Sequence, residues 1–145
     1  MIDGFRLLQQ DHREVERLFA EYETSGDPMV VREICFQLVL HTEAEEAVLY
    51  PAVRSLVTDG AELASRAEFE HQQVKDDVAR LYDAAPADVA AIVHHLRSMV
   101  EAHVSEEERE LLPLLADAGL DARQLGDALV VAKERARPDA VRLAS

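Results

Sequence analysis

The segments HTEAEEAVLYP (residues 41–51) and HVSEEERELLP (residues 103–113) are two versions of one pattern. They share a histidine, two glutamates, a leucine and a proline at the same offsets. The histidine and the first shared glutamate stand four residues apart, which places both side chains on one face of an α-helix. A second pair of segments, DHREV (11–15) and EHQQV (70–74), shares an acidic residue, a histidine and a valine. The chain therefore consists of two similar halves, each with one His helix and one His-x-x-x-Glu helix.

Turn signals between these segments divide the chain into helices. Glycine or proline near residues 25–28, 59–60, 85–86 and 118–119 predicts where helices begin and end. The predicted long helices cover 3–24, 28–58 with a kink at Pro51, 61–84 and 86–116, and a shorter one covers 121–135. Four long helices with short connections predict an all-α protein, an up-down-up-down antiparallel four-helix bundle over residues 1–118. Residues 119–145 are expected to form the short C-terminal fifth helix and a frayed tail beyond it, from about Pro138.

The apolar seam of each predicted long helix is interrupted by histidine or glutamate. Apolar residues recur at alternating spacings of three and four, which is typical of a helix face that packs in a core. Glutamate is rarely buried unless it is paired or bound to a metal, because removing its charge from water costs several kcal/mol. Counting from the turns at about 1.5 Å per residue puts the interruptions within roughly one helical turn of a common plane. These six candidate metal ligands are His12, His41, Glu45, His71, His103 and Glu107.

Each of these features alone has a simpler explanation. His12 or His71 on an apolar seam is more often a hydrogen-bonded core histidine, and one His/Glu pair is usually a surface pairing worth a few tenths of a kcal/mol. The six together, on the seams, at one level and duplicated between the halves, favour a metal site. The duplication predicts two metals, with one bridging glutamate from each half. The alternative is a purely structural bundle.

The residue types restrict the kind of metal site. Cys35 is the single cysteine, so neither a disulfide nor a cysteine zinc site can form within the chain. Imidazole and carboxylate ligands without thiolate suit iron, manganese or zinc. A mononuclear zinc site would leave two or three of the six ligands unused. A ferritin-like site needs two Glu-x-x-His motifs, and Glu68-x-x-His71 is the single one in this sequence.

At these residues the sequence resembles the hemerythrin-like (HHE) cation-binding family, over essentially residues 1–118. The matching elements, in chain order, are His12, His41-x-x-x-Glu45 with Tyr50-Pro51, His71, and His103-x-x-x-Glu107 with Leu112-Pro113. The resemblance implies two Fe ions (Fe2+/Fe3+) with an oxo or hydroxo bridge as the cofactor. It also implies that the histidines are terminal ligands and that Glu45 and Glu107 bridge the two irons.

One position departs from the oxygen-carrying members of that family. They use a second histidine one turn after the third-helix histidine, where this chain has Lys75. Four histidines, two bridging carboxylates and a bridging oxygen fill ten of roughly twelve octahedral positions, which leaves about one open on each iron. Water, peroxide, Tyr50 or Glu46 could fill these positions, and Tyr50 is otherwise a packing residue. Lys75 could supply a cation or a proton, or simply extend to the surface. The departure argues against simple reversible oxygen carriage.

Other polar residues near the candidate ligands are expected outside the site. His94 and His95 lie about 12 Å from the nearest candidate ligand along their helix, which is too far for the same metal. Glu108 and its neighbours Glu106 and Glu110 are expected on a solvated acidic face, with support of His103 as the alternative.

Composition restricts the partners. The net charge of −14 disfavours nucleic acid and anionic membranes, whose phosphates require Lys and Arg. Neither a signal peptide nor an apolar stretch of membrane-spanning length is evident, so a cytoplasmic location is expected. We expect a protein that binds or reacts with O2, peroxide or NO, for detoxification or for redox, oxygen or iron sensing. A catalase-like or peroxidase enzyme and an iron-responsive interaction module are the alternatives. The sequence leaves the protein partner unknown and the question of enzymatic activity open.

Overall fold

The computed structural model describes residues 2–144, which form helices joined by short turns. The long helices are α1 (Gly4–Ser25), α2 (Pro28–Ala44), α4 (Gly60–Asp83), α5 (Val89–Glu106) and α7 (Ala122–Leu143). The short segments are η1 (Glu45–Leu49), α3 (Tyr50–Leu56), η2 (Pro86–Asp88), η3 (Glu107–Leu111) and α6 (Leu112–Asp117). Between residues 2 and 144 there is no β-strand, so the prediction of an all-α protein is confirmed.

Capping residues set the helix ends that the sequence signals predicted. The Asp3 carboxylate accepts hydrogen bonds from the backbone N–H groups of Phe5 (2.9 Å) and Arg6 (3.3 Å) at the start of α1. Helix α1 ends at Gly26, whose φ of 61° is a left-handed conformation that glycine adopts without steric cost. Asp27 then caps α2, and its carboxylate accepts a hydrogen bond from a backbone N–H of the first turn.

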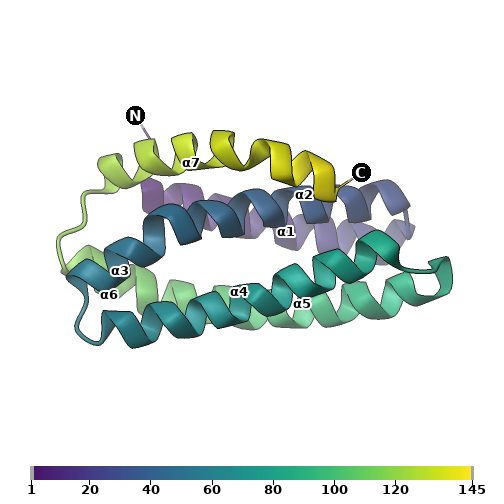
Figure 1. Ribbon diagram of the computed structural model, residues 1–145, viewed down its shortest axis with the longest axis horizontal. Coiled ribbons are helices and arrows are strands. Elements are labelled where there is room, and N and C mark those ends of the chain that lie inside the picture. Colours follow the sequence, from purple (N-terminus) through teal and green to yellow (C-terminus); the bar gives the residue numbers. More distant parts are fainter. Residues whose placement is uncertain (1, 145) are drawn as a thin grey trace.

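The long helices lie side by side in an elongated bundle (Figure 1). Short connections at the same end of the bundle join α1 to α2 and α4 to α5, and the helices of each pair pack against one another. Helix α7 runs along α1 and α2 and makes its most extensive contact with α2. None of the described helices combines the length and apolar character that a membrane crossing requires.

Two π-helical turns, η1 and η3, interrupt the second and fourth long segments at equivalent places. Each begins at a candidate ligand, Glu45 or Glu107, and each is followed by a short helix with proline in its first turn. Proline has no N–H to donate, so the regular i→i−4 hydrogen-bond pattern is broken next to it. The distortion expected at Pro51 therefore takes the form of a wider turn, closed by a hydrogen bond from the Tyr50 N–H to the Glu45 carbonyl.

Helix α7 is long, which contradicts the predicted short helix over 121–135 and the frayed tail. It extends to Leu143 and contains Pro138 in its interior. Ala132, Ala136 and Ala140, spaced four residues apart, are at most 9% exposed and pack in the core. The prediction was wrong because burial of this small-residue face stabilises the helix by more than the hydrogen bond that the proline removes.

Two apolar clusters fill the bundle on either side of one polar layer. One cluster contains Val15, Leu38, Val74 and Val100, and the other contains Leu8, Ala44, Ala67 and Leu111. Along α1, α2 and α4 the candidate histidine lies between members of the two clusters, and along the continuous segment of α5 and η3 His103 lies between Val100 and Leu111. Residues of α7 pack in both clusters. The polar layer is therefore sealed from both ends of the bundle.

Candidate metal centre

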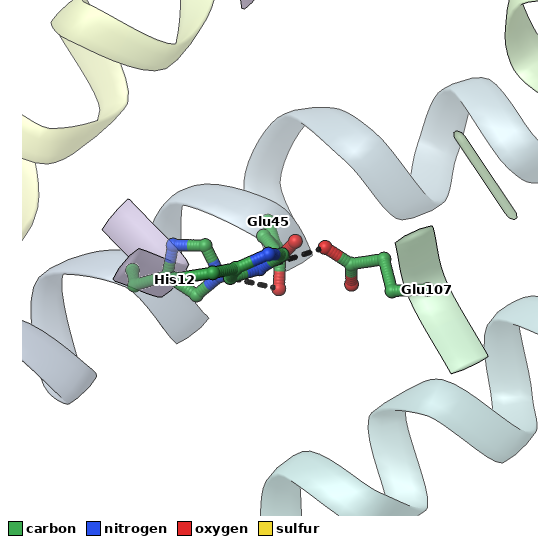
Figure 2. Close-up of side chains that lie close together, drawn as sticks. His12, Glu45 and Glu107 are labelled. Atoms are coloured by element: carbon green, nitrogen blue, oxygen red, sulfur yellow. Dashed lines mark hydrogen bonds and ion pairs between the residues drawn. The ribbon is translucent and has the colours of Figure 1, made fainter. Parts of the chain in front are cut away.

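Side chains from six segments of the chain meet in the polar layer. His12 lies on α1, His41 on α2 and His71 on α4. His103 is on α5, and the glutamates are the first residues of the two π turns. The six side chains are His12, His41, Glu45, His71, His103 and Glu107, and each is 7% exposed or less. Figure 2 shows His12, Glu45 and Glu107 approaching one another from separate parts of the bundle. The structure thus brings together all six residues that the sequence predicted.

The donor atoms form two groups that share both carboxylates. In the first group the Nε2 atoms of His12 and His41 are 3.2 Å apart. His12 Nε2 lies 3.2 Å from Glu107 Oε1, and His41 Nε2 lies 3.1 Å from Glu45 Oε1. Within each group all donor atoms lie within 4.8 Å of one another.

The second group repeats this geometry with the other two histidines. The Nε2 atoms of His71 and His103 are 3.1 Å apart. His71 Nε2 lies 3.1 Å from Glu45 Oε1, and His103 Nε2 lies 3.2 Å from Glu107 Oε2. Each glutamate therefore contacts one histidine of each group, as the duplication in the sequence predicted for bridging carboxylates.

Two carboxylate oxygens indicate that the cluster fits metal ions. Glu45 Oε2 and Glu107 Oε1 are fully buried and have no hydrogen-bond partner. Glu107 Oε1 lies near His12 Nε2, but this contact lacks hydrogen-bond geometry. A buried carboxylate oxygen without a partner is costly unless a cation compensates it. Four imidazole nitrogens and two carboxylates without thiolate are the ligands that iron, manganese or zinc accept.

In the protein without metal, charges within the cluster shift its pKa values strongly. Burial raises the pKa of Glu45, but the charge of His41 and hydrogen bonds from neighbouring side chains hold that pKa well below its usual range. Burial lowers the pKa of His41, but Glu45, Asp11 and Glu107 together raise it to about 10. Hydrogen bonds to carboxylates, chiefly Glu107, likewise outweigh burial and raise the pKa of His103 well above its ordinary value. Protons on His41 and His103 therefore compensate the buried carboxylates when no metal is bound.

The metal-free protein is expected to lose stability as the pH rises from about 7 to about 10. The pKa of His41 lies at about 10 in the folded protein against 6.5 for the ordinary side chain, so its stabilising contribution is complete below pH 6.5 and is lost toward pH 10. Melting temperatures of chelated protein at pH 7 and pH 9.5 test this. The exposed His94→Gln variant should show the same fall, and His41→Ala a smaller one. An equal fall in His41→Ala and wild type would contradict the assignment.

Each candidate histidine also has a carboxylate on its second ring nitrogen. The pairs are His12 Nδ1 with Glu108 (2.6 Å), His41 Nδ1 with Asp11 (3.0 Å), His71 Nδ1 with Glu46 (3.3 Å) and His103 Nδ1 with Glu70 (2.8 Å). An N–H donated from Nδ1 to a carboxylate fixes the tautomer that leaves Nε2 free to bind a metal. The four histidines are thus held with Nε2 toward the centre.

Sequence reasoning missed most of these carboxylates. Glu108 was expected on a solvated face, but its side chain is 21% exposed and bonded to His12, so that prediction was wrong. Asp11 and Glu70 were not predicted at all. A signal was present, because an acidic residue precedes both His12 and His71, and a second glutamate follows both Glu45 and Glu107.

Tyr50 and Lys75 occupy different positions relative to the cluster. The Tyr50 hydroxyl is buried 2.8 Å from His71 Nε2 and 3.3 Å from His103 Nε2. Burial, together with the charge of Glu45, raises its pKa well above the usual value. The Lys75 ammonium lies 2.8 Å from Glu46 Oε1, and its side chain is 36% exposed. Tyr50 therefore belongs to the centre, whereas Lys75 contacts its surroundings.

A small cavity adjoins the four histidines. Its volume is about 20 Å³, and its other walls are formed by Val15, Leu38, Val74, Val100 and Val104, with Asp11 and Thr42. One water molecule needs about 10–15 Å³ measured in this way, so the cavity admits a single water-sized species. The apolar walls leave the histidine nitrogens as the main polar groups that such a species would meet.

A helical bundle that buries four histidines and two shared glutamates defines a cation-binding protein. The chain belongs to the hemerythrin family: the family model described as the hemerythrin HHE cation binding domain matches residues 3–115. It is 34% identical over 111 residues to a protein named DNA nickase from Nostoc sp. (strain PCC 7120 / SAG 25.82 / UTEX 2576). That match covers 72% of this chain but 31% of the relative, so the chain spans about a third of the relative's length.

A solved structure shares the fold. It is a hemerythrin HHE cation binding domain-containing protein from Mycobacterium kansasii, with a TM-score of 0.80 and 21% sequence identity. The match covers 98% of this chain and 91% of the other. The shared architecture therefore includes α7, which lies beyond the residues matched by the family model.

Proposed function

We propose that the protein holds two iron ions at the six buried residues and binds or reacts with O2, peroxide or NO. An oxo or hydroxo bridge between the irons follows from the family resemblance. The observation that supports the proposal most strongly is the sharing of Glu45 and Glu107 between two groups of histidines. A mononuclear site would use one group and leave the second group of buried histidines without a purpose.

The residues of the chain have distinct roles in this proposal. The four Nε2 atoms would hold the irons as terminal ligands, and each of the two carboxylates would be shared between the irons. When bound, iron supplies the one-electron redox chemistry that protein side chains lack. The carboxylates on the Nδ1 atoms keep the imidazoles oriented, and the apolar clusters on both sides keep water out.

Tyr50 is the proposed additional ligand, on the side of His71 and His103. Its hydroxyl lies near both ring nitrogens, whereas the equivalent position in the second half of the chain is Leu112. If Tyr50 also held the metal, about eleven of twelve octahedral positions would be filled, and a small ligand would have to bind on the side of His12 and His41. Glu46 is not proposed as a ligand, because its oxygens already contact His71 and Lys75.

The cavity beside the histidines supports a small ligand. It accommodates a diatomic molecule or peroxide more readily than a larger organic substrate. Its apolar walls disfavour bulky anions and reductants, because burial of an uncompensated charge is costly. These features fit a protein for detoxification, or for redox, oxygen or iron sensing.

Two other functions use the same centre. A catalase-like or peroxidase enzyme would turn over peroxide there, and an iron-responsive module would change a partner contact when the metal leaves. Oxygen release from added peroxide that is lost in His41→Ala would favour the enzyme over a passive binder. DNA nicking is not proposed for this chain, since a net charge of −14 disfavours contact with a phosphate backbone.

Iron loading tests the proposal directly. Protein loaded with Fe2+ without oxygen and then oxidised is expected to retain about two irons per chain and to absorb in the near ultraviolet. The optical spectrum is expected to change when peroxide or NO is added. A chain that retains no iron after such loading would refute the proposal, and retention without any response to these ligands would limit it to metal storage.

The Tyr50→Phe variant is expected to keep two irons but to lose a visible absorption band. A tyrosinate bound to Fe3+ absorbs in the visible region, and phenylalanine fills the same space without the hydroxyl. Metal analysis and the spectrum of oxidised protein measure both quantities. Tyr22→Phe, at a partly buried tyrosine of α1 outside the cluster, is the matched control. A visible band that survives in Tyr50→Phe would show that Tyr50 is a packing residue.

A further inference from the structure

Helix α7 supplies a cation to the surroundings of the metal centre. The Lys133 ammonium forms an ion pair with Asp11 Oδ2, and the same oxygen lies 3.0 Å from His41 Nδ1. A continuous chain of contacts thus leads from α7 through α1 to a candidate ligand on α2. Lys133 lies outside residues 3–115, the part of the chain that the family model matches.

The Lys133–Asp11 ion pair is less exposed to solvent than two other ion pairs made by carboxylates that contact the histidines. Lys133 is 20% exposed and Asp11 is 16% exposed at the side chain. Arg13, which contacts Glu108, is 56% exposed, and Lys75 is 36% exposed. Partly buried ion pairs are screened by salt much less than exposed ones. Of these three pairs, the Lys133 pair can therefore influence its histidine most.

Packing of α7 directs Lys133 toward Asp11. Leu129, one turn before Lys133, is fully buried, and Ala136, about one turn after Lys133, is 5% exposed. Near the start of the helix, a Cβ atom added to Gly126 would lie 2.3 Å from the Ile2 carbonyl oxygen, so the two backbones approach closely there. The helix is therefore held in the bundle on both sides of the ion pair.

We propose that α7 is part of the metal centre: Lys133 fixes Asp11, and Asp11 holds His41 with Nε2 directed at the cluster. This inference depends on the proposed metal site. If the packing of α7 favours metal binding on the side of His12 and His41, then metal binding favours the packing of α7 to the same extent, because the coupling of two equilibria is reciprocal. Lys133 acts as a positioning residue that does not touch the metal.

Iron release to a chelator tests the role of Lys133. In the Lys133→Met variant one of the two irons is expected to leave up to about tenfold faster. Lys133 acts through Asp11, and removing a direct outer partner of a ligand costs about 10- to 100-fold in metal affinity. The visible band of Tyr50 should persist during this phase, since that residue lies on the other side of the cluster. Lys133→Arg should restore slow release. Arg135→Met removes an exposed charge from the same helix and should leave release unchanged.

The outcomes separate this inference from the proposed function. Wild-type protein that retains no iron refutes the metal site itself. Wild-type protein with two irons, together with equal release from Lys133→Met, overturns the role of Lys133 alone. Equal acceleration in Arg135→Met and Lys133→Met would also overturn it, because the effect would then be one of net charge.

Hydrogen exchange of the wild-type chain provides a test without any variant. Amides of residues 122–143 are expected to exchange more slowly in the iron-loaded protein than in the metal-free protein. Exchange in this helix that does not depend on metal would contradict the coupling, even if Lys133→Met failed to fold.

Discussion

Removal of the metal is expected to lower the melting temperature of the protein by about 10 °C or more. A ligand present at a thousand times its Kd stabilises the folded state by about 4 kcal/mol. In a domain of this size each kcal/mol shifts the melting temperature by about 2–4 °C. The donors come from α1, α2, α4 and α5 and the two π turns, so the bound metal restrains most of the bundle at once.

Calorimetry of the iron-loaded protein before and after chelation at pH 7 measures this effect. Restoring iron should restore the melting temperature, which excludes irreversible damage by the chelator. A variant that cannot bind iron should melt at one temperature under both conditions. A loaded protein whose melting temperature does not respond to chelation would show that the cluster is held by its own protons and ion pairs alone.

The convergence of the six candidate ligands could be predicted from the sequence because it depends on regular helix geometry. Three-and-four spacing identifies the buried face of each helix, and the rise per residue sets the height of each side chain. His12 and His71 satisfy both conditions, and the count requires only the positions of the turns, not their conformations. The same regularity explains why the all-α class was predicted, and why the duplicated segments 41–51 and 103–113 were decisive.

The direction of Tyr50 could not be predicted because it depends on an irregular turn. In a regular α-helix a residue five positions after Glu45 would point to a different side of the helix. The π turn closes over five residues and places Tyr50 above Glu45, toward the same centre. The sequence indicated a distortion at Pro51. Several kinds of helix distortion can accommodate a residue without an N–H group, and the packing around the helix decides which one forms.

Most of the carboxylates around the histidines were missed because they pair across helices. Asp11 precedes His12 by one residue, so it points about 100° away around the helix and meets His41 on α2 instead. Glu108 likewise contacts His12 rather than a residue of its own helix. Such pairings depend on how each helix is rotated against its neighbour. The extent of α7 was missed for a related reason, since Pro138 is tolerated only because the helix face is packed.

The Glu45→Gln variant is expected to lose both irons, whereas His71→Ala is expected to keep about one. Glu45 belongs to both donor groups, and His71 belongs to one. Glutamine has the size of glutamate but lacks the charge, so each iron loses an anionic ligand while the packing is preserved. The side chain of Glu45 is fully buried, so water cannot replace the missing oxygen easily.

Iron analysis after identical loading distinguishes shared from unshared ligands. Glu33→Gln changes the same residue type at an exposed position of α2 and should keep two irons. If Glu45→Gln and His71→Ala each kept one iron, Glu45 would serve a single metal, and the two groups would be separate sites. If Glu45→Gln kept both, the buried carboxylate would be a partner for protonated histidines rather than a ligand. If Glu45→Gln loses both irons while His71→Ala keeps one, a single carboxylate must serve two ions. A shared carboxylate is the feature that separates a binuclear centre from two neighbouring sites.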